Sequence, residues 1–208
     1  RDQPRSRGLG DVYKRQVVYS ETLVTKPWLL YQIIHLSSRR ILVFFVESSV
    51  TTHMCPICQA TLRYRDSRPR IRRKEGGLKD QLIIRRFYCK NCHSYHNELP
   101  DCLTPYKQYE TEVISGVLDG VVTPEDADSE DYPSMQTMRR WLLWLQVNLA
   151  NIEGYLRSTG YSIFRLGEGV LFSKGSLLKA IRKKYQNWLE IILRLIYNSG
   201  GFLAPIPW

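Results

Sequence analysis

The sequence lacks any apolar run long enough to cross a membrane. Its longest strongly apolar stretch, ILVFFV at Ile41–Val46, has six residues, whereas a membrane-spanning helix needs about 20. Cysteine is scarce as well, because five cysteines in 208 residues are too few for a disulfide scaffold. No cleavable secretory signal can be recognised. We therefore expect no membrane partner and a location in the reducing cytoplasm.

Signatures of catalysis are also missing. The glycines of GEGVLFSKGS lack the spacing of a loop that cradles phosphate. The acidic residues between Glu125 and Asp131 are neighbours in one segment. Two-metal catalysis instead needs carboxylates that converge from separate strands and a helix around two divalent metals. We therefore predict that the chain is not an enzyme.

The first residues are set apart from the rest of the chain. It begins with RDQPRSRGLGDVYKRQ and has no methionine before Met54. Residues 1–16 resemble translated sequencing adapter, and a genuine basic, disordered arm is the alternative. Residues 17–39 are open to a similar interpretation, as upstream sequence translated in frame. We treat residues 1–40 as a doubtful segment and expect the fold to begin with a strand near Ile41.

Two C-x-x-C pairs carry the clearest chemical signal. Cys55 and Cys58 form the first pair, and Cys89 and Cys92 form the second. Two intervening residues let the chain turn so that both thiolates reach one ion at about 2.3 Å. Four thiolates close a tetrahedral shell, so we predict a structural Zn²⁺ site. A redox motif, bound iron or a degenerate site are the alternatives, although a redox pair would open a helix and strands are expected beside both pairs.

Three histidines lie near the cysteine pairs. His93 and His96 follow the second pair and could replace a cysteine as ligand or donate a hydrogen bond to one. Because the two pairs already supply four ligands, we expect neither histidine to be a ligand, and we expect the same of His53. The fifth cysteine, Cys102, is expected to be a buried, unreactive thiol.

The segment between the pairs predicts a basic β-hairpin. Alternation in ATLRYRDS and QLIIRRFYC indicates two strands, and KEGGLKD indicates the turn between them. The chain carries a net charge of +10, which favours a polyanionic partner, either nucleic acid or an acidic membrane surface. Arginine forks suit phosphates and guanine edges, although a solvated face that binds nothing is the alternative. The predicted nucleic-acid contacts on the hairpin are Arg63, Arg65, Arg68, Arg70, Arg72, Arg73, Lys74, Arg85 and Arg86. Joint replacement of Arg70, Arg72 and Arg73 is expected to weaken duplex binding without unfolding.

The second half of the chain predicts helices. Apolar spacing indicates one helix in YKQYETEVISGVLDG, a long one in SMQTMRRWLLWLQVNLANIEGYLRS with Ser134 as N-cap, and a final one in SLLKAIRKKYQNWLEIILRLIYNSGG that ends at Gly200. Arg139 and Arg140 lie near the start of the long helix, where a helix-turn-helix protein would contact base edges. An ordinary amphipathic helix is the alternative.

Several of these segments resemble one family. CPIC, RRFYCKNCHSYHNELPDCLTPYKQYETEVISGVLDG, TMRRWLLWL and LRLIYNSGGFL resemble an uncharacterised bacterial family, domain of unknown function 6431, found largely in Firmicutes. The resemblance covers roughly residues 41–202. It implies a zinc ribbon whose ligands match the four paired cysteines and, by similarity to the N-terminal regions of several transposases, DNA binding. It implies no catalytic residue.

These observations predict an α+β protein. Residues 41–103 would form a strand and a four-cysteine zinc ribbon with a small antiparallel sheet, and residues 104–208 a helical domain. The expected function is non-catalytic, zinc-dependent DNA binding associated with a mobile element. The alternative is a protein-interaction module in which the ribbon is a scaffold and helices carrying Trp141, Trp144 and Trp188 dock a partner subunit. A homo-oligomer is a further option.

Overall fold

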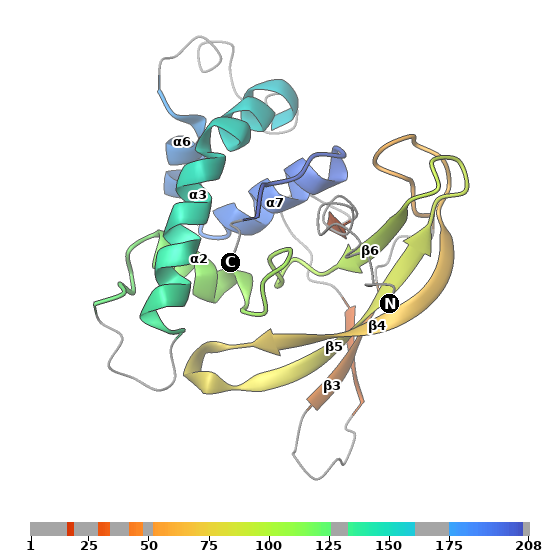
Figure 1. Ribbon diagram of the computed structural model, residues 1–208, viewed down its shortest axis with the longest axis horizontal. Coiled ribbons are helices and arrows are strands. Elements are labelled where there is room, and N and C mark those ends of the chain that lie inside the picture. Colours follow the sequence, from red (N-terminus) through yellow and green to blue (C-terminus); the bar gives the residue numbers. More distant parts are fainter. Residues whose placement is uncertain are drawn as a thin grey trace, which may run out of the picture.

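The computed structural model describes residues 16–18, 29–33, 42–47, 52–125, 133–160 and 175–205 (Figure 1). Only the backbone is described for nearly all of the first three segments. Residues 1–15 and residues 126–131 of the acidic segment lie outside the described residues. The expectations that fall on them therefore stay predictions.

The sheet is built around β5 (Lys79–Tyr88). β4 (Arg63–Arg73) pairs antiparallel with it across a 3₁₀ turn at Glu75–Gly77. Both glycines of this turn have a φ near 70°, at 69° and 68°, a backbone region that glycine enters without steric cost. β6 (Tyr95–Leu99) pairs antiparallel with the other edge of β5. This three-stranded antiparallel unit confirms the small sheet predicted from the sequence.

Three further strands extend the sheet. β3 (Leu42–Glu47) runs parallel to β5, which confirms the strand expected near Ile41. β2 (Leu29–Ile33) pairs antiparallel with β3, and β1 (Gln16–Val18) pairs parallel with β6. Two strands thus fall within residues 1–40, the segment that the sequence analysis set apart.

Helices gather on one side of the molecule, and β4 and β5 form a long, curved ribbon that runs alongside them (Figure 1). The Ser134 side chain accepts a hydrogen bond from the backbone N–H of Thr137, as an N-cap should, and confirms the predicted start of the long helix. The described helices are α2 (Thr111–Leu118), α3 (Met135–Tyr155), which runs into a π turn at Leu156–Gly160, α6 (Leu177–Lys184) and α7 (Trp188–Asn198). None of them has the length and hydropathy of a membrane span.

The last predicted helix is in fact two helices. Tyr185 is extended, with φ −126° and ψ 124°, and separates α6 from α7. The break lets Trp188 turn into the core, where its indole N–H donates to Asp119 Oδ2 at 2.8 Å. The predicted stop at Gly200 is confirmed, because this residue has a φ of 79° and follows the last turn of α7.

Two apolar cores meet on β5. Leu82 and Ile84 pack in a large core with residues of all four helices. Further along the same strand, Phe87 packs with Leu62 and two of the cysteines in a small second core. The helical core therefore extends across residue 103, where the sequence suggested a boundary between units.

The tryptophans belong to the interior. Trp141, Trp144 and Trp188 are all buried in the large core. These side chains are therefore not available to a partner in the folded chain, whereas the alternative hypothesis that the helical region docks a partner subunit stays a prediction. Apolar periodicity identified the helices but could not distinguish the face of α3 that is covered from the face that is exposed.

Candidate metal centre and arginine-rich hairpin

The four cysteines of the two pairs converge beside the sheet. Their Sγ atoms all lie within 4.8 Å of one another. Cys55 Sγ is 3.6 Å from Cys92 Sγ, and Cys58 Sγ is 3.4 Å from Cys89 Sγ. A tetrahedral ion with metal–sulfur bonds of about 2.3 Å holds its sulfur atoms about 3.8 Å apart. The cluster therefore has both the composition and the spacing of a four-sulfur metal site.

The two cysteine turns are built alike. The N–H of Cys55 donates to the carbonyl five residues later at 2.8 Å, and the N–H of Cys89 does the same at 2.9 Å. The residues that follow the second cysteine of each turn, Gln59 and His93, have left-handed φ values of 58° and 55°. Neither turn opens a helix, as a thioredoxin-like motif requires. The matching turns instead present their thiols to one shared point.

Polar side chains surround the cluster without displacing a cysteine. His96 is buried, and its Nε2 lies 3.4 Å from Cys55 Sγ. Ser94 Oγ lies 2.8 Å from Cys92 Sγ. His93 is exposed, with Nδ1 2.9 Å from the hydroxyl of a tyrosine on β5. The contacts of His96 and Ser94 suit groups that orient sulfur ligands through hydrogen bonds.

The thiols differ in acidity before any metal binds. Burial raises the pKa of Cys55 to about 12. Hydrogen bonds, first from the backbone of Ala60 and then from the side chain of Asn91, lower the pKa of Cys58 to about 6. A cation bound to all four sulfurs would favour the thiolate form of each and release protons. Cys102 is only partly buried, but desolvation raises its pKa to about 11, in keeping with the unreactive thiol expected there.

Arg72 forms the centre of a buried ion-pair network. It donates from Nε and Nη2 to the carboxylate of Asp80 at 2.8 and 2.6 Å, and its Nη1 lies 3.1 Å from Glu110 Oε1. Lys74 Nζ adds a contact of 3.0 Å to Asp80. Burial alone would raise the pKa of Asp80, but its bonds with Arg72 and Lys74 outweigh burial and lower it. Arg72 and Lys74 are therefore both engaged in ion pairs within the protein, with Lys74 still 33% exposed.

Other predicted contacts are engaged within the protein as well. Arg85 forms a bidentate pair with Glu98 at 2.6 and 2.9 Å, and Arg86 forms one with Asp66. Arg70 is half-buried, desolvation lowers its pKa, and it donates to a backbone carbonyl at 3.1 Å. The guanidinium of Arg73 lies over the ring of Tyr109. Each of these four arginines therefore has a partner within the protein.

Three predicted contacts remain exposed on β4. Arg63 and Arg68 form no ion pair with any residue that the structure describes, and Arg65 bonds the hydroxyl of Tyr95 and lies over its ring. Arg63 pairs in register with Tyr88, the residue before Cys89. We call Arg63, Arg65 and Arg68 the exposed arginine row. It lies on the half of the hairpin that is nearest the cysteine cluster.

The second predicted nucleic-acid element has less support. Arg139 is exposed on the first turns of α3, with Nη2 3.8 Å from Glu125 Oε1, and Arg140 is half-buried. The segment that joins α2 to α3 includes residues 126–132, which lie outside the described residues. The two helices pack together, but a helix-turn-helix is not shown.

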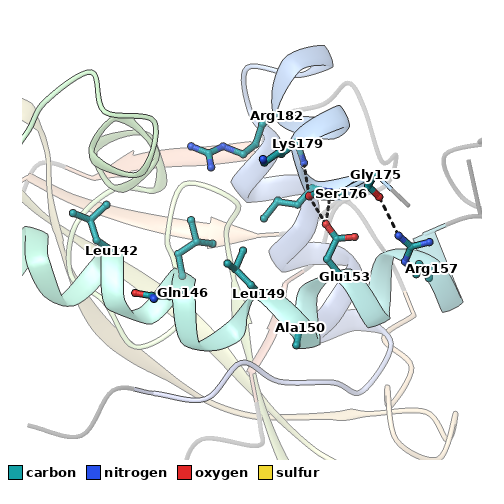
Figure 2. Close-up of a pocket in the computed structure, with 12 residues that line it drawn as sticks. Leu142, Gln146, Leu149, Ala150, Glu153, Arg157, Gly175, Ser176, Lys179 and Arg182 are labelled. Atoms are coloured by element: carbon teal, nitrogen blue, oxygen red, sulfur yellow. Dashed lines mark hydrogen bonds between the residues drawn. The ribbon is translucent and has the colours of Figure 1, made fainter. Parts of the chain in front are cut away.

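Sequence reasoning missed a groove between α3 and α6. Its volume is about 620 Å³, and Leu142 and Leu149 of α3 project toward Lys179 and Arg182 of α6 (Figure 2). The available signal was the excess of apolar residues in MRRWLLWLQVNLA, which is more than one buried face of a helix requires.

Residues 55–141 match the family model described as "Domain of unknown function (DUF6431)". The matched range holds all four clustered cysteines, the hairpin, α2 and the start of α3. It agrees with the family named from the sequence, over a shorter stretch. No curated protein and no solved structure matches the chain. The family description names no activity, so function has to be argued from the residues.

Proposed function

We propose that the chain is a non-catalytic, zinc-stabilised protein that binds DNA through the exposed arginine row. The observation that carries the proposal is the position of this row on a strand held beside the four-cysteine cluster. A fixed strand holds the backbone of its arginines in place, so little backbone freedom is lost when phosphates bind.

Zinc is the ion that the donor set favours. Four cysteine sulfurs in a tetrahedral arrangement are typical of structural zinc sites. Cys55, Cys58, Cys89 and Cys92 would hold the ion, and the closed shell would leave no position for a substrate. Its contribution would be folding free energy for a small core that has little apolar area of its own. We also propose that the protein is associated with a transposase, and this part is supported only by the family resemblance of the sequence.

The test is duplex DNA binding measured by fluorescence anisotropy over a series of salt concentrations. Each phosphate contact contributes about −0.9 to the slope of log K against log salt. Replacing Arg63 and Arg68 together by alanine should make the slope shallower by about 1.8 and weaken binding at low salt. Neither arginine forms an ion pair with a described residue, and Arg68 contributes only a longer-range attraction to Asp66, so the fold should be little affected.

A matched control separates a defined surface from general charge. Lys183→Ala with Lys184→Ala removes the same two charges from exposed positions on α6. The control should retain the slope and affinity of the unaltered protein. Equal losses in both double variants would mean unspecific attraction to a basic protein. An unchanged slope in the arginine variant would refute the proposed surface.

A further inference from the structure

The groove between α3 and α6 has an apolar floor that is open to solvent. Leu142 and Leu149 are 39% and 40% exposed, and Leu145 and Leu178 lie buried beneath them. From Leu142 to Glu153 the α3 axis advances about 16 Å, or roughly three helical turns. A floor of this length fits the apolar face of one short helix, which such grooves bind through side chains spaced three, four and seven residues apart.

One wall of the groove is strongly basic. α6 has the sequence LLKAIRKK and carries four cations and no acidic residue. Its Lys179 lines the groove, as do Arg182 and, from beyond the end of α3, Arg157 (Figure 2). Arg182 shares its charge with Asp119, whose Oδ1 accepts from Nε at 2.9 Å. Lys179 and Arg157 add positive charge at the rim, where Arg157 Nη2 also donates to the carbonyl of Gly175 at 3.1 Å.

The groove's acidic residue is already hydrogen-bonded within the fold. Glu153 is the sole carboxylate among the described residues that line it. Its two oxygens accept the backbone N–H groups of Leu177 and Leu178 at 3.0 Å each, and the hydroxyl of Ser176. The carboxylate thus satisfies the N-terminus of α6. An incoming ligand would meet leucines flanked by cations.

We propose that this groove binds an acidic amphipathic helix of a protein partner. The apolar face of that helix would cover Leu142 and Leu149, and carboxylates on its flanks would pair with Lys179 and Arg157. Charge complementarity selects this occupant, because a basic or uncharged helix would leave the cationic rim unmatched. The proposal is independent of DNA binding. The proposed DNA contacts lie on β4, whereas the groove lies between α3 and α6.

The probe is a pair of fluorescein-labelled synthetic helices with the same leucines at three- and four-residue spacing. One carries glutamate on its flanks and the other carries lysine. Anisotropy titrations with the whole chain should show saturable binding of the acidic helix, at least tenfold tighter than the basic one. Equal affinity for the two probes, or no saturable binding of either, would overturn the proposal.

Variants then place the contact. Leu142→Gln with Leu149→Gln should weaken binding of the acidic helix tenfold or more. The matched control is Leu143→Gln with Val147→Gln, which alters two other exposed apolar residues of α3 outside the groove and should leave affinity unchanged. Lys179→Glu should weaken the acidic helix several-fold and bring the two probes closer in affinity. Equal losses in both glutamine pairs would refute the groove as the site.

Two other occupants give distinct results. Sedimentation equilibrium of the chain alone would detect a dimer, and a dimer that dissociates in the Leu142 and Leu149 variant would assign the groove to a second copy. Co-sedimentation with phosphatidylserine vesicles that is lost in the same variant would assign it to a lipid surface. Either result would overturn the protein-helix proposal.

Discussion

Replacing Arg72 by methionine should strongly destabilise the protein, although the residue lies in a strand that looks from sequence like a solvated arginine ladder. The Arg72 side chain is 7% exposed and that of Asp80 is 3% exposed, with two hydrogen bonds of 2.6–2.8 Å between them. Methionine preserves much of the volume but leaves the Asp80 carboxylate buried with Lys74 as its remaining cation. The same change also removes the contact to Glu110.

The expected cost follows from breaking a buried pair on one side. Such changes cost about 3–5 kcal/mol, because the remaining charge is left without compensation. Lys74 Nζ stays within 3.0 Å of Asp80, so we expect the lower end, about 3 kcal/mol. For a chain of this length, that loss lowers Tm by about 6–12 °C.

The measurement is guanidinium unfolding in zinc-containing buffer at pH 7, followed by tryptophan fluorescence. Arg63→Met is the control, since Arg63 is exposed on the same strand and its loss should cost less than about 0.5 kcal/mol. The pKa of Asp80 is lower in the folded state than in the unfolded state. The ionised Asp80 carboxylate therefore contributes its full stability above its unfolded pKa, and this contribution disappears as pH falls through its folded pKa. The difference between Arg72→Met and the unaltered protein should therefore shrink below about pH 4. A difference under 1 kcal/mol at pH 7 would refute this account of the network.

Three further changes test other parts of the structure. Cys89→Ser should reduce bound zinc from about one ion per chain toward none, whereas the control Cys102→Ser should retain the ion. Zinc content is measured by plasma mass spectrometry. Equal zinc content in the two variants would show that Cys89 is not a ligand. Burial, followed by the charge of a nearby aspartate, raises the pKa of Glu190 to about 7, so the unaltered protein should lose stability as pH rises from about 4.5 through 7. Glu190→Gln should be more stable at pH 8 by about 1–2 kcal/mol and equal at pH 4; a pH-independent difference would argue against the raised pKa. Asn148 is buried, and its side-chain amide forms two hydrogen bonds with the backbone of Ala204, at 2.7 and 3.0 Å. Asn148→Ala should therefore lower the free energy of unfolding by about 2 kcal/mol, measured by thermal or denaturant unfolding. A loss under 0.5 kcal/mol would show that these hydrogen bonds contribute little.

The cysteine cluster was the part of the site that sequence alone could predict. The C-x-x-C spacing is a local property, and it needs only a turn at each pair for the thiols to meet. The strands, the glycine turn and the Ser134 cap were predictable for the same reason, because each depends on neighbouring residues. The family resemblance pointed to the same region that the family model matches, residues 55–141.

The roles of the arginines could not be predicted in this way. Arg68 and Arg72 are of one residue type on one strand, yet Arg72 meets Asp80 and Glu110 whereas Arg68 stays exposed. Glu110 is distant in sequence, and only the packing of the segment before α2 against the hairpin brings it to Arg72. For the same reason, the joint replacement of Arg70, Arg72 and Arg73 would confound loss of binding with loss of structure. The exposed pair Arg63 and Arg68 is the better target.

β5 is a single strand that contributes to two interiors. Phe87 packs beside the cysteines, and Leu82 and Ile84 pack beneath the helices. Because β5 is ordered between the two cores, unfolding of either core would disturb the strand on which the other core packs. Calorimetry should therefore record one cooperative heat-absorption peak, and a chelator should shift that whole peak to lower temperature by mass action. The distant helices would in effect report the occupancy of the sulfur site.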